Sequence, residues 1–247
     1  MLSKADLTQG SITGTLLRFT LPMIIGSLLQ QCYNIADTLI VGQCIGSGAL
    51  AAVGSAYTLM VFLISILLGL SMGSGTVFSL QYGAGRMKAL RRSIYVSAVL
   101  IGTVTIVLNI AALSFIHPIL KLLQIPDDIY QMMYDYLWII FWGIGFTFIY
   151  NFYAALLRAI GNAVTPLYFL AISVVLNIGL DLFFILLLDW GIKGAAIATV
   201  AAQGVSALGI MGYAYVKYPE LRLHRNDLHF DLSLIHISEP TRHLRIS

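Results

Sequence analysis

Charged residues are scarce in this chain. Of its 247 residues only 10% are Asp, Glu, Lys or Arg, whereas 59% are hydrophobic. An average soluble domain has about 25% charged residues. The chain therefore lacks the polar exterior that a water-soluble fold needs, and its mean hydropathy of +0.88 agrees with this. We expect an integral membrane protein.

Cysteine and basic runs are also nearly missing, and histidine is scarce outside the C-terminal end. Cys32 and Cys44 would lie about 18 Å apart along one helix, too far for a mutual disulfide. His117 is the only histidine before His224, so no metal-binding cluster is apparent, and neither HExxH nor a Walker-type glycine loop occurs. No dense Lys/Arg run indicates nucleic-acid binding. We expect no enzyme activity, no cofactor and no nucleic-acid partner.

Long apolar runs are what the sequence does have. Each is long enough to cross a bilayer as a helix, the default where the backbone must satisfy its own hydrogen bonds. The alternating pattern of a membrane barrel is absent. The sequence thus predicts an all-α polytopic membrane protein whose six spans lie near residues 16–42, 50–80, 93–116, 129–153, 163–188 and 192–216.

The basic residues that flank these spans are distributed unequally. Leaving aside two arginines near the C-terminus, ten lie on one side and two on the other. The side with ten holds Lys4, Arg18, Arg86, Lys88, Arg91, Arg92, Arg158, Lys217, Arg222 and Arg225, and the other holds Lys121 and Lys193. The positive-inside rule then puts both ends of the six-span unit in the cytoplasm of a cell bounded by a plasma (inner) membrane.

Polar residues on four spans share one depth in this topology. At 1.5 Å per residue, Asp37 and Asp181 lie about 8 and 10 Å below the outer end of their spans. Tyr136 and Thr199 also lie about 10 Å down. Asn177 is one helical turn deeper than Asp181, on the same face.

This coincidence of depth predicts an ion site. An Asp near the centre of a membrane span costs about 2.5–3.5 kcal/mol, so two acids need partners or a role. Such a carboxyl can take up a proton. With Asn177 and Thr199, Asp37 and Asp181 could instead hold Na⁺. The alternatives are that Asn177 and Thr199 are ordinary interhelical hydrogen-bonding residues, or that Tyr136 is an interfacial aromatic residue.

Two segments of the chain resemble each other. PMIIGSLLQQCYNIAD runs from Pro22 through Asn34 to Asp37, and PLYFLAISVVLNIGLD ends with Asn177 and Asp181. Each segment is followed by a stretch rich in Gly and Ala that begins the next span. Internal repeats of this kind are common in secondary transporters. Pro22 would loosen the first span and is the predicted hinge, while Asn34 and Gln203 are secondary site candidates.

These stretches carry a family resemblance. RFTLPMIIGSLLQQCYNIADTLIVG followed by LAAVG resembles the opening of a MATE transporter, of the multidrug and toxic compound extrusion family. LLRAIGNAVTPLYFLAISVVLNIGLDLFF followed by WGIKGAAIATVAAQG is similar to that family's fifth and sixth helices. The resemblance implies a twelve-helix protein of two six-helix lobes that exports cationic amphipathic compounds in exchange for H⁺ or Na⁺.

The resemblance also implies roles for individual residues. In the prokaryotic branch the ion site lies in the first lobe, where the family pattern matches Asp37, Tyr136, Asn177, Asp181 and Thr199. The partners would be the lipid bilayer, a C-terminal six-helix lobe and small cationic substrates.

The resemblance sets the expected organisation of the chain. Residues 1–12 would form a cytoplasmic leader, 13–217 the transmembrane lobe and 218–234 the start of an inter-lobe linker. Residues 235–247 turn polar and would be a non-native tail.

Two other functions compete with cation-coupled efflux. A flippase for lipid-linked oligosaccharides, from the same superfamily, would need a basic cavity, yet no Lys or Arg falls deep in a span. A non-transport membrane subunit would have no reason to gather Asp37 and Asp181 at one level.

Overall fold

The computed structural model of the protein describes residues 12–223, and this range folds into helices joined by short turns. A π-helical turn, η1 (Phe183–Leu187), extends the sixth helix, and a 3-10 turn, η2 (Pro219–Leu221), follows the seventh. The α-helices are α1 (Ile12–Cys44), α2 (Ser47–Gly83), α3 (Met87–Ser114), α4 (Ile116–Leu122), α5 (Asp127–Ala159), α6 (Val164–Leu182) and α7 (Gly191–Lys217).

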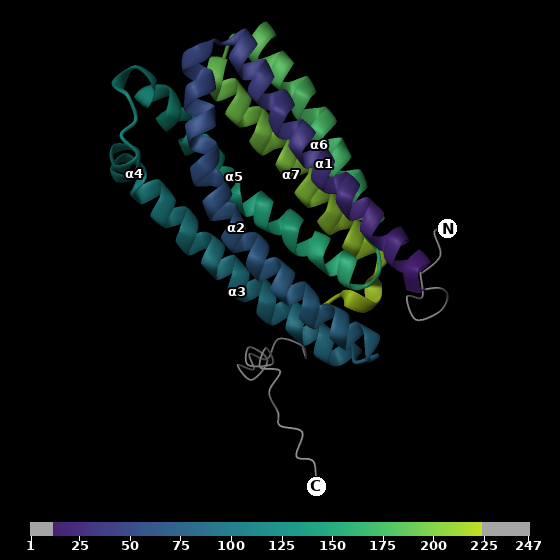
Figure 1. The fold of residues 1–247 in the computed structure, drawn as a ribbon. Helices are drawn as coiled ribbons and strands as arrows, with labels where there is room; N and C mark the ends of the chain where they lie inside the picture. Colours follow the sequence, from purple (N-terminus) through teal and green to yellow (C-terminus); the bar gives the residue numbers. More distant parts are fainter. Residues whose placement is uncertain (1–11, 224–247) are drawn as a thin grey trace.

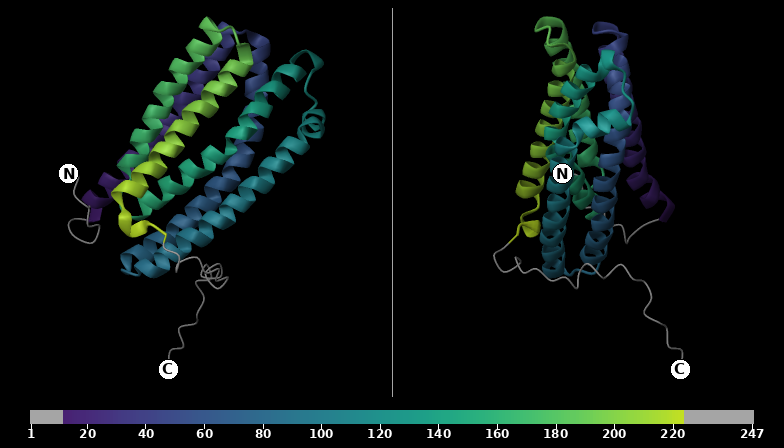
Figure 2. Two further views of the ribbon diagram at one scale, coloured as in Figure 1. Left: turned by 180° about the vertical axis from the view of Figure 1, so that it is seen from behind. Right: turned by 90° about the vertical axis from the view of Figure 1, so that its left-hand side faces the viewer.

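The six long helices form one elongated bundle in which successive long helices run in opposite directions (Figures 1 and 2). We call the end where α1 stops and α5 and α7 begin the upper end, as drawn in Figure 1. Each predicted span coincides with one long helix, and no strand occurs between residues 12 and 223. The predicted all-α polytopic fold is therefore confirmed. The predicted tail and nearly all of the predicted leader lie outside the described residues.

Five long helices, α2, α3, α5, α6 with η1, and α7, are long and apolar enough to cross a membrane. Helix α1 has 33 residues but is not one of the five. The second half of α1 carries the polar residues Gln30, Gln31, Asn34 and Asp37. Polar residues on a long helix at the edge of a membrane bundle usually face protein or an aqueous path, because lipid does not solvate them.

Helix α1 lies at the edge of the bundle, packed mainly against α6 and α2 (Figure 1). Its apolar residues Leu21, Leu28 and Ile35 are 57%, 60% and 60% exposed, so one side of α1 has no protein cover. Pro22 lies inside α1 without interrupting it.

Helix α4 was not predicted, because residues 117–128 look like a loop with prolines near both ends. The structure instead forms a two-turn helix that buries Ile116 and Leu120. Pro118 is accommodated because it lies in the first turn, where the backbone N–H has no partner within the helix.

Helices α5 and α7 form the centre of the bundle. Gly143 on α5 has no room for a side chain, since an added Cβ would lie 2.7 Å from Val200 Cγ2 on α7. Buried alanines of α7, including Ala195, Ala196 and Ala202, let the two backbones approach closely. This close packing fixes the two helices that carry Tyr136 and Thr199.

Candidate functional site

The five predicted site residues come from four helices and are all buried. Asp37 is on α1, Tyr136 on α5, Asn177 and Asp181 on α6, and Thr199 on α7. Asn177 and Asp181 are 0% exposed. The other three are 6–7% exposed. The helices lie around a common interior, so these polar groups face protein rather than the outside of the bundle.

Two hydrogen bonds join the helices at this site. The Asn177 Nδ2 amide donates to Thr199 Oγ1 at 3.3 Å, which links α6 to α7. The Tyr33 hydroxyl donates to the same Oγ1 at 3.4 Å, which links α1 to α7. Thr199 of α7 thus accepts hydrogen bonds from two other helices, α1 and α6.

The carboxyl groups of Asp37 and Asp181 are electrostatic neighbours, and both also act on the phenol of Tyr136. We call these two carboxyl groups, with the side chains of Tyr136, Asn177 and Thr199, the acid pocket. Two buried acids that act on each other's charge resist being ionised at the same time, because like charges repel strongly where water is excluded.

Four oxygens of the acid pocket are buried without a hydrogen-bond partner. They are Asp37 Oδ1, Asn177 Oδ1 and both carboxyl oxygens of Asp181. A buried acceptor without a donor is costly, and a buried charge without a counter-charge costs more. A proton on one of the two acids would let Asp37 and Asp181 hydrogen-bond to each other. A small hard cation would bind several of these oxygens at once, since carboxylate and amide oxygens are the ligands such cations take.

Tyr33 is a site residue that the sequence reading missed. It lies one turn before Asp37 on the same face of α1, at the spacing i−4 that makes helical neighbours. The depth argument added Asn177 as the residue one turn deeper than Asp181 but did not apply the same spacing to Asp37. Its spacing from Asp37 is the signal that could have identified it.

The secondary candidates lie apart from these contacts. The Asn34 amide donates to Gln31 Oε1 at 3.1 Å on the same helix. Gln203 Oε1 accepts a hydrogen bond from Thr147 Oγ1 at 3.0 Å and ties α7 to α5. Pro22 precedes Asp37 by 15 residues, about 22 Å along α1, so it can act on the acid pocket only through movement of the helix.

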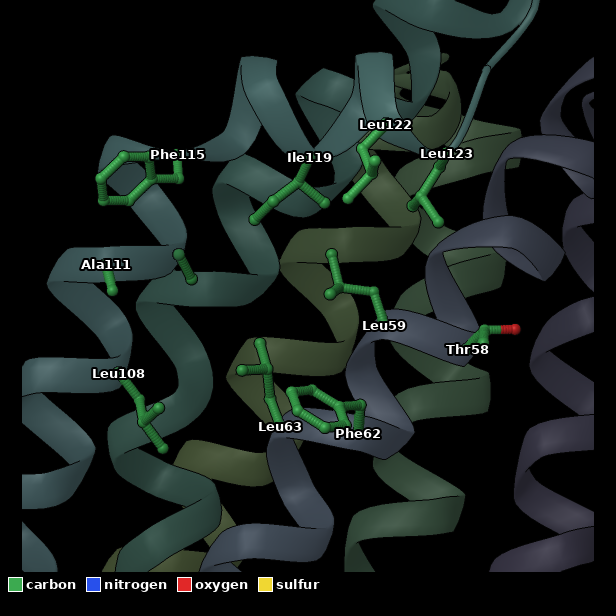
Figure 3. A pocket seen from close by; sticks show the side chains of 11 residues that line it. Thr58, Leu59, Phe62, Leu63, Leu108, Ala111, Phe115, Ile119, Leu122 and Leu123 are labelled. Atoms are coloured by element: carbon green, nitrogen blue, oxygen red, sulfur yellow. The ribbon is translucent and has the colours of Figure 1, made fainter.

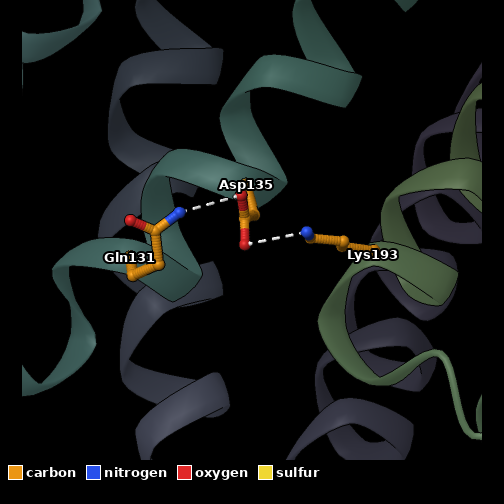
Figure 4. Close-up of polar contacts among 3 residues, drawn as sticks. All are labelled: Gln131, Asp135 and Lys193. Carbon is orange, nitrogen blue, oxygen red and sulfur yellow. Dashed lines mark hydrogen bonds and ion pairs between the residues drawn. The ribbon is translucent and has the colours of Figure 1, made fainter.

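An ion pair also joins α5 and α7, at the upper end of the bundle. Lys193 Nζ lies 3.3 Å from Asp135 Oδ2, and the Gln131 amide donates to Asp135 Oδ1 at 3.1 Å (Figure 4). Asp135 precedes Tyr136 in the chain, but its side chain lies on a different face of α5. The sequence reading used Lys193 only as a topology marker.

Comparison with known proteins identifies the family. The MatE family model matches residues 22–183, which carry Asp37, Tyr136, Asn177 and Asp181. The chain belongs to the MatE family. The resemblance found in the sequence is therefore confirmed.

Relatives of this MatE chain are named for multidrug resistance or for transport. The chain is 36% identical over 203 residues to a probable multidrug resistance protein, YpnP, of Bacillus subtilis, covering 82% of this chain and 46% of that protein. It is 26% identical over 224 residues to an FAD transporter of Shewanella oneidensis, covering 87% and 48%. The chain thus spans about half the length of the curated relatives it matches.

A solved structure has the same fold. It is an outward-facing multidrug resistance MATE transporter of the MOP superfamily, with a TM-score of 0.87 at 24% identity. The match covers 95% of this chain and 52% of that one.

Proposed function

We propose that this chain forms one lobe of a cation-coupled efflux transporter, in which the acid pocket binds the coupling ion, H⁺ or Na⁺. The observation that carries the proposal is the set of four buried, unpartnered oxygens on Asp37, Asn177 and Asp181. Helices that served only as a structural scaffold would gain nothing from these unpartnered oxygens. An ion-coupled carrier, by contrast, needs a site whose free energy changes when the ion binds.

Loading changes the charge of the acid pocket by one unit. With both acids ionised, the pocket holds two like charges in a water-poor interior. The ion is either one H⁺ on a carboxyl oxygen or one Na⁺ shared by Asp37, Asn177, Asp181 and the Thr199 hydroxyl. Its binding changes the net charge of the acid pocket from −2 to −1. The loaded pocket can then draw α1 toward α6 and α7, since the repulsion between the two acids has fallen.

Helix α1 is the helix best placed to move when the ion binds in the acid pocket. It carries Asp37 and Tyr33, lies at the edge of the bundle, and is linked to α7 by the 3.4 Å hydrogen bond to Thr199. The close-packed pair of α5 and α7 provides a fixed wall. In this proposal α1 bends near Pro22 when the ion is exchanged, and so alters the space available to cargo.

The complete carrier would contain a second six-helix lobe, because alternating access requires two halves that move against each other around a site. The exposed apolar side of α1 is consistent with that arrangement. Both chain ends of the lobe are proposed to be cytoplasmic, in the plasma (inner) membrane.

The acid pocket is assigned to the coupling ion rather than to cargo. Among the buried residues of the described chain, the charged ones are Asp37 and Asp181, both acidic. This favours a bound cation over the pyrophosphate that an oligosaccharide flippase would hold. The relatives are named for multidrug resistance and for FAD transport, so their names differ in cargo. We propose cationic amphipathic compounds as the cargo, and the experiment below tests this directly.

The test uses the full-length protein in a host that lacks its own efflux pumps. We expect resistance to cationic amphipathic drugs with the wild type, and loss of resistance with Asp37→Asn or Asp181→Asn. Asp128→Asn is the matched control, because Asp128 is an exposed acid in the first turn of α5. Unchanged resistance in well-expressed Asp37→Asn and Asp181→Asn cells would refute the assigned site.

A further inference from the structure

A groove follows the outer surface between α5 and α7, on the far side of these helices from the acid pocket. Its volume is about 460 Å³, and its walls include Trp138, Trp142 and Phe146 of α5 and Ile197 and Leu208 of α7. Trp138 lies two residues after Tyr136, about 200° around α5, so it points away from the acid pocket. We call this space the tryptophan groove.

The tryptophan groove is lined by apolar side chains, and an ion pair lies at its upper end. Asp135 lies one turn above Trp138 on α5, and Lys193 lies one turn above Ile197 on α7. Their ion pair therefore stands over the upper end of the groove. Lys193 is 58% exposed and Asp135 only 21%, so the ammonium is the more accessible of the two charges. The ion pair with Asp135 uses one of the three N–H donors that a lysine ammonium carries.

The length of the groove is close to the thickness of one bilayer leaflet. From Ile197 to Leu208 the groove runs 11 residues, about 16 Å along α7. Half the hydrocarbon core of a bilayer is about 15 Å thick. A fatty acyl chain in the groove would lie beside the two indole rings, with its headgroup at the level of Lys193. Trp142 is 63% exposed, so the space is open from the outside of the bundle.

A second groove provides the contrast. It lies between α2, α3 and α4, has a volume of about 530 Å³, and is walled by side chains such as Phe62, Leu63, Leu108 and Phe115 (Figure 3). Thr58 is the one polar residue among those that line it, and none of them is charged. The walls of the tryptophan groove carry no charge either, so the difference between the two grooves is the ion pair of Lys193 and Asp135 above the tryptophan groove.

We propose that the tryptophan groove is a phospholipid site, in which an acyl chain lies along Trp138 and Trp142 and the phosphate accepts a hydrogen bond from Lys193 Nζ. Asp135 orients the lysine from the other side. The lipid belongs to the leaflet in which α5 and α7 begin, the outer one in the predicted orientation. The site is separate from the acid pocket, so it does not depend on the proposed transport function.

The experiment measures quenching of tryptophan fluorescence by brominated lipids. The chain contains three tryptophans, Trp138, Trp142 and Trp190. In the full-length protein every tryptophan except Trp138 and Trp142 is replaced by phenylalanine, and the protein is placed in phosphatidylcholine vesicles. Dibrominated phosphatidylcholine and dibrominated diacylglycerol, which lacks the phosphate, are compared at equal mole fraction. A protein whose sole tryptophan is Phe62→Trp reports on the second groove and corrects for the different depths of the two lipids.

We expect the phospholipid to bind the tryptophan groove about fivefold more tightly than the diacylglycerol, the order of one exposed charge-assisted contact. The second groove should show no such preference. Lys193→Gln should remove the preference, and Lys193→Arg should keep it, which separates loss of the charge from misfolding. Equal quenching by both lipids in the wild type would overturn the proposal. So would no quenching at all, since another helix would then cover the groove.

Discussion

Replacing Thr199 with valine removes the one hydroxyl that joins three helices at the acid pocket. Valine keeps the shape of threonine, so the change deletes the acceptor without opening a cavity. The donors of Asn177 and Tyr33, at 3.3 and 3.4 Å, then lose their partner inside the protein. A typical hydrogen bond contributes about 0.5–1.5 kcal/mol, and both of these are longer than the usual range of about 2.5–3.2 Å, so each falls in the lower half of that contribution.

The expected loss is therefore about 1–2 kcal/mol in the ion-loaded state, which weakens the apparent affinity for the coupling cation about 5- to 30-fold. The assay is cargo efflux from proteoliposomes that contain the full-length protein, with the coupling cation titrated. The maximal rate should change less than the half-saturating cation concentration, because at saturation the pocket is again loaded.

Thr105→Val is the matched control. Thr105 is also buried, but its hydroxyl donates to the Ile101 carbonyl within α3 and contacts no part of the acid pocket. An unchanged half-saturating concentration in Thr199→Val, or an equal shift in Thr105→Val, would refute the assignment of Thr199 to the ion site.

Three further changes test separate parts of the structure. Tyr33→Phe keeps the ring and removes one donor to Thr199, so the same titration should shift about 2- to 10-fold. Gly143→Ala forces a methyl group against Val200 and should lower the melting temperature of the purified protein, with partial rescue by adding Val200→Ala. Asp189 has φ +52, so Asp189→Gly should leave the melting temperature unchanged or raise it, whereas Asp189→Val should lower it.

Hydropathy was enough to predict the long helices. Each apolar run became one helix, because a backbone in lipid has few other ways to satisfy its hydrogen bonds. Hydropathy could not predict α4, whose seven residues are too short to register as a span. It also could not predict the π turn after Asp181, because the extra residue per turn depends on packing beyond α6, where Phe184 stacks on Trp190 at 5.0 Å.

For the acid pocket, the sequence reading combined polar residue type with depth along each helix. Counting residues from the span ends selected Asp37, Asp181 and three neighbours, and the structure buries all five. Depth alone does not give the direction in which a side chain points. Asn34 was a secondary candidate because it lies between Pro22 and Asp37 in the repeated segment, yet it hydrogen-bonds along its own helix. Tyr33, one residue earlier, was passed over although its hydroxyl reaches Thr199.

The central claim is that Asp37 and Asp181 together bind the coupling cation. The most direct measurement is cation flux coupled to cargo gradients in proteoliposomes of the full-length protein, recorded separately for H⁺ and Na⁺. We predict that one of the two cations moves against cargo in the wild type and in Asp128→Asn, and that this flux is absent when Asp37→Asn and Asp181→Asn are combined. Cargo-coupled cation flux that persists in the double variant would contradict the account.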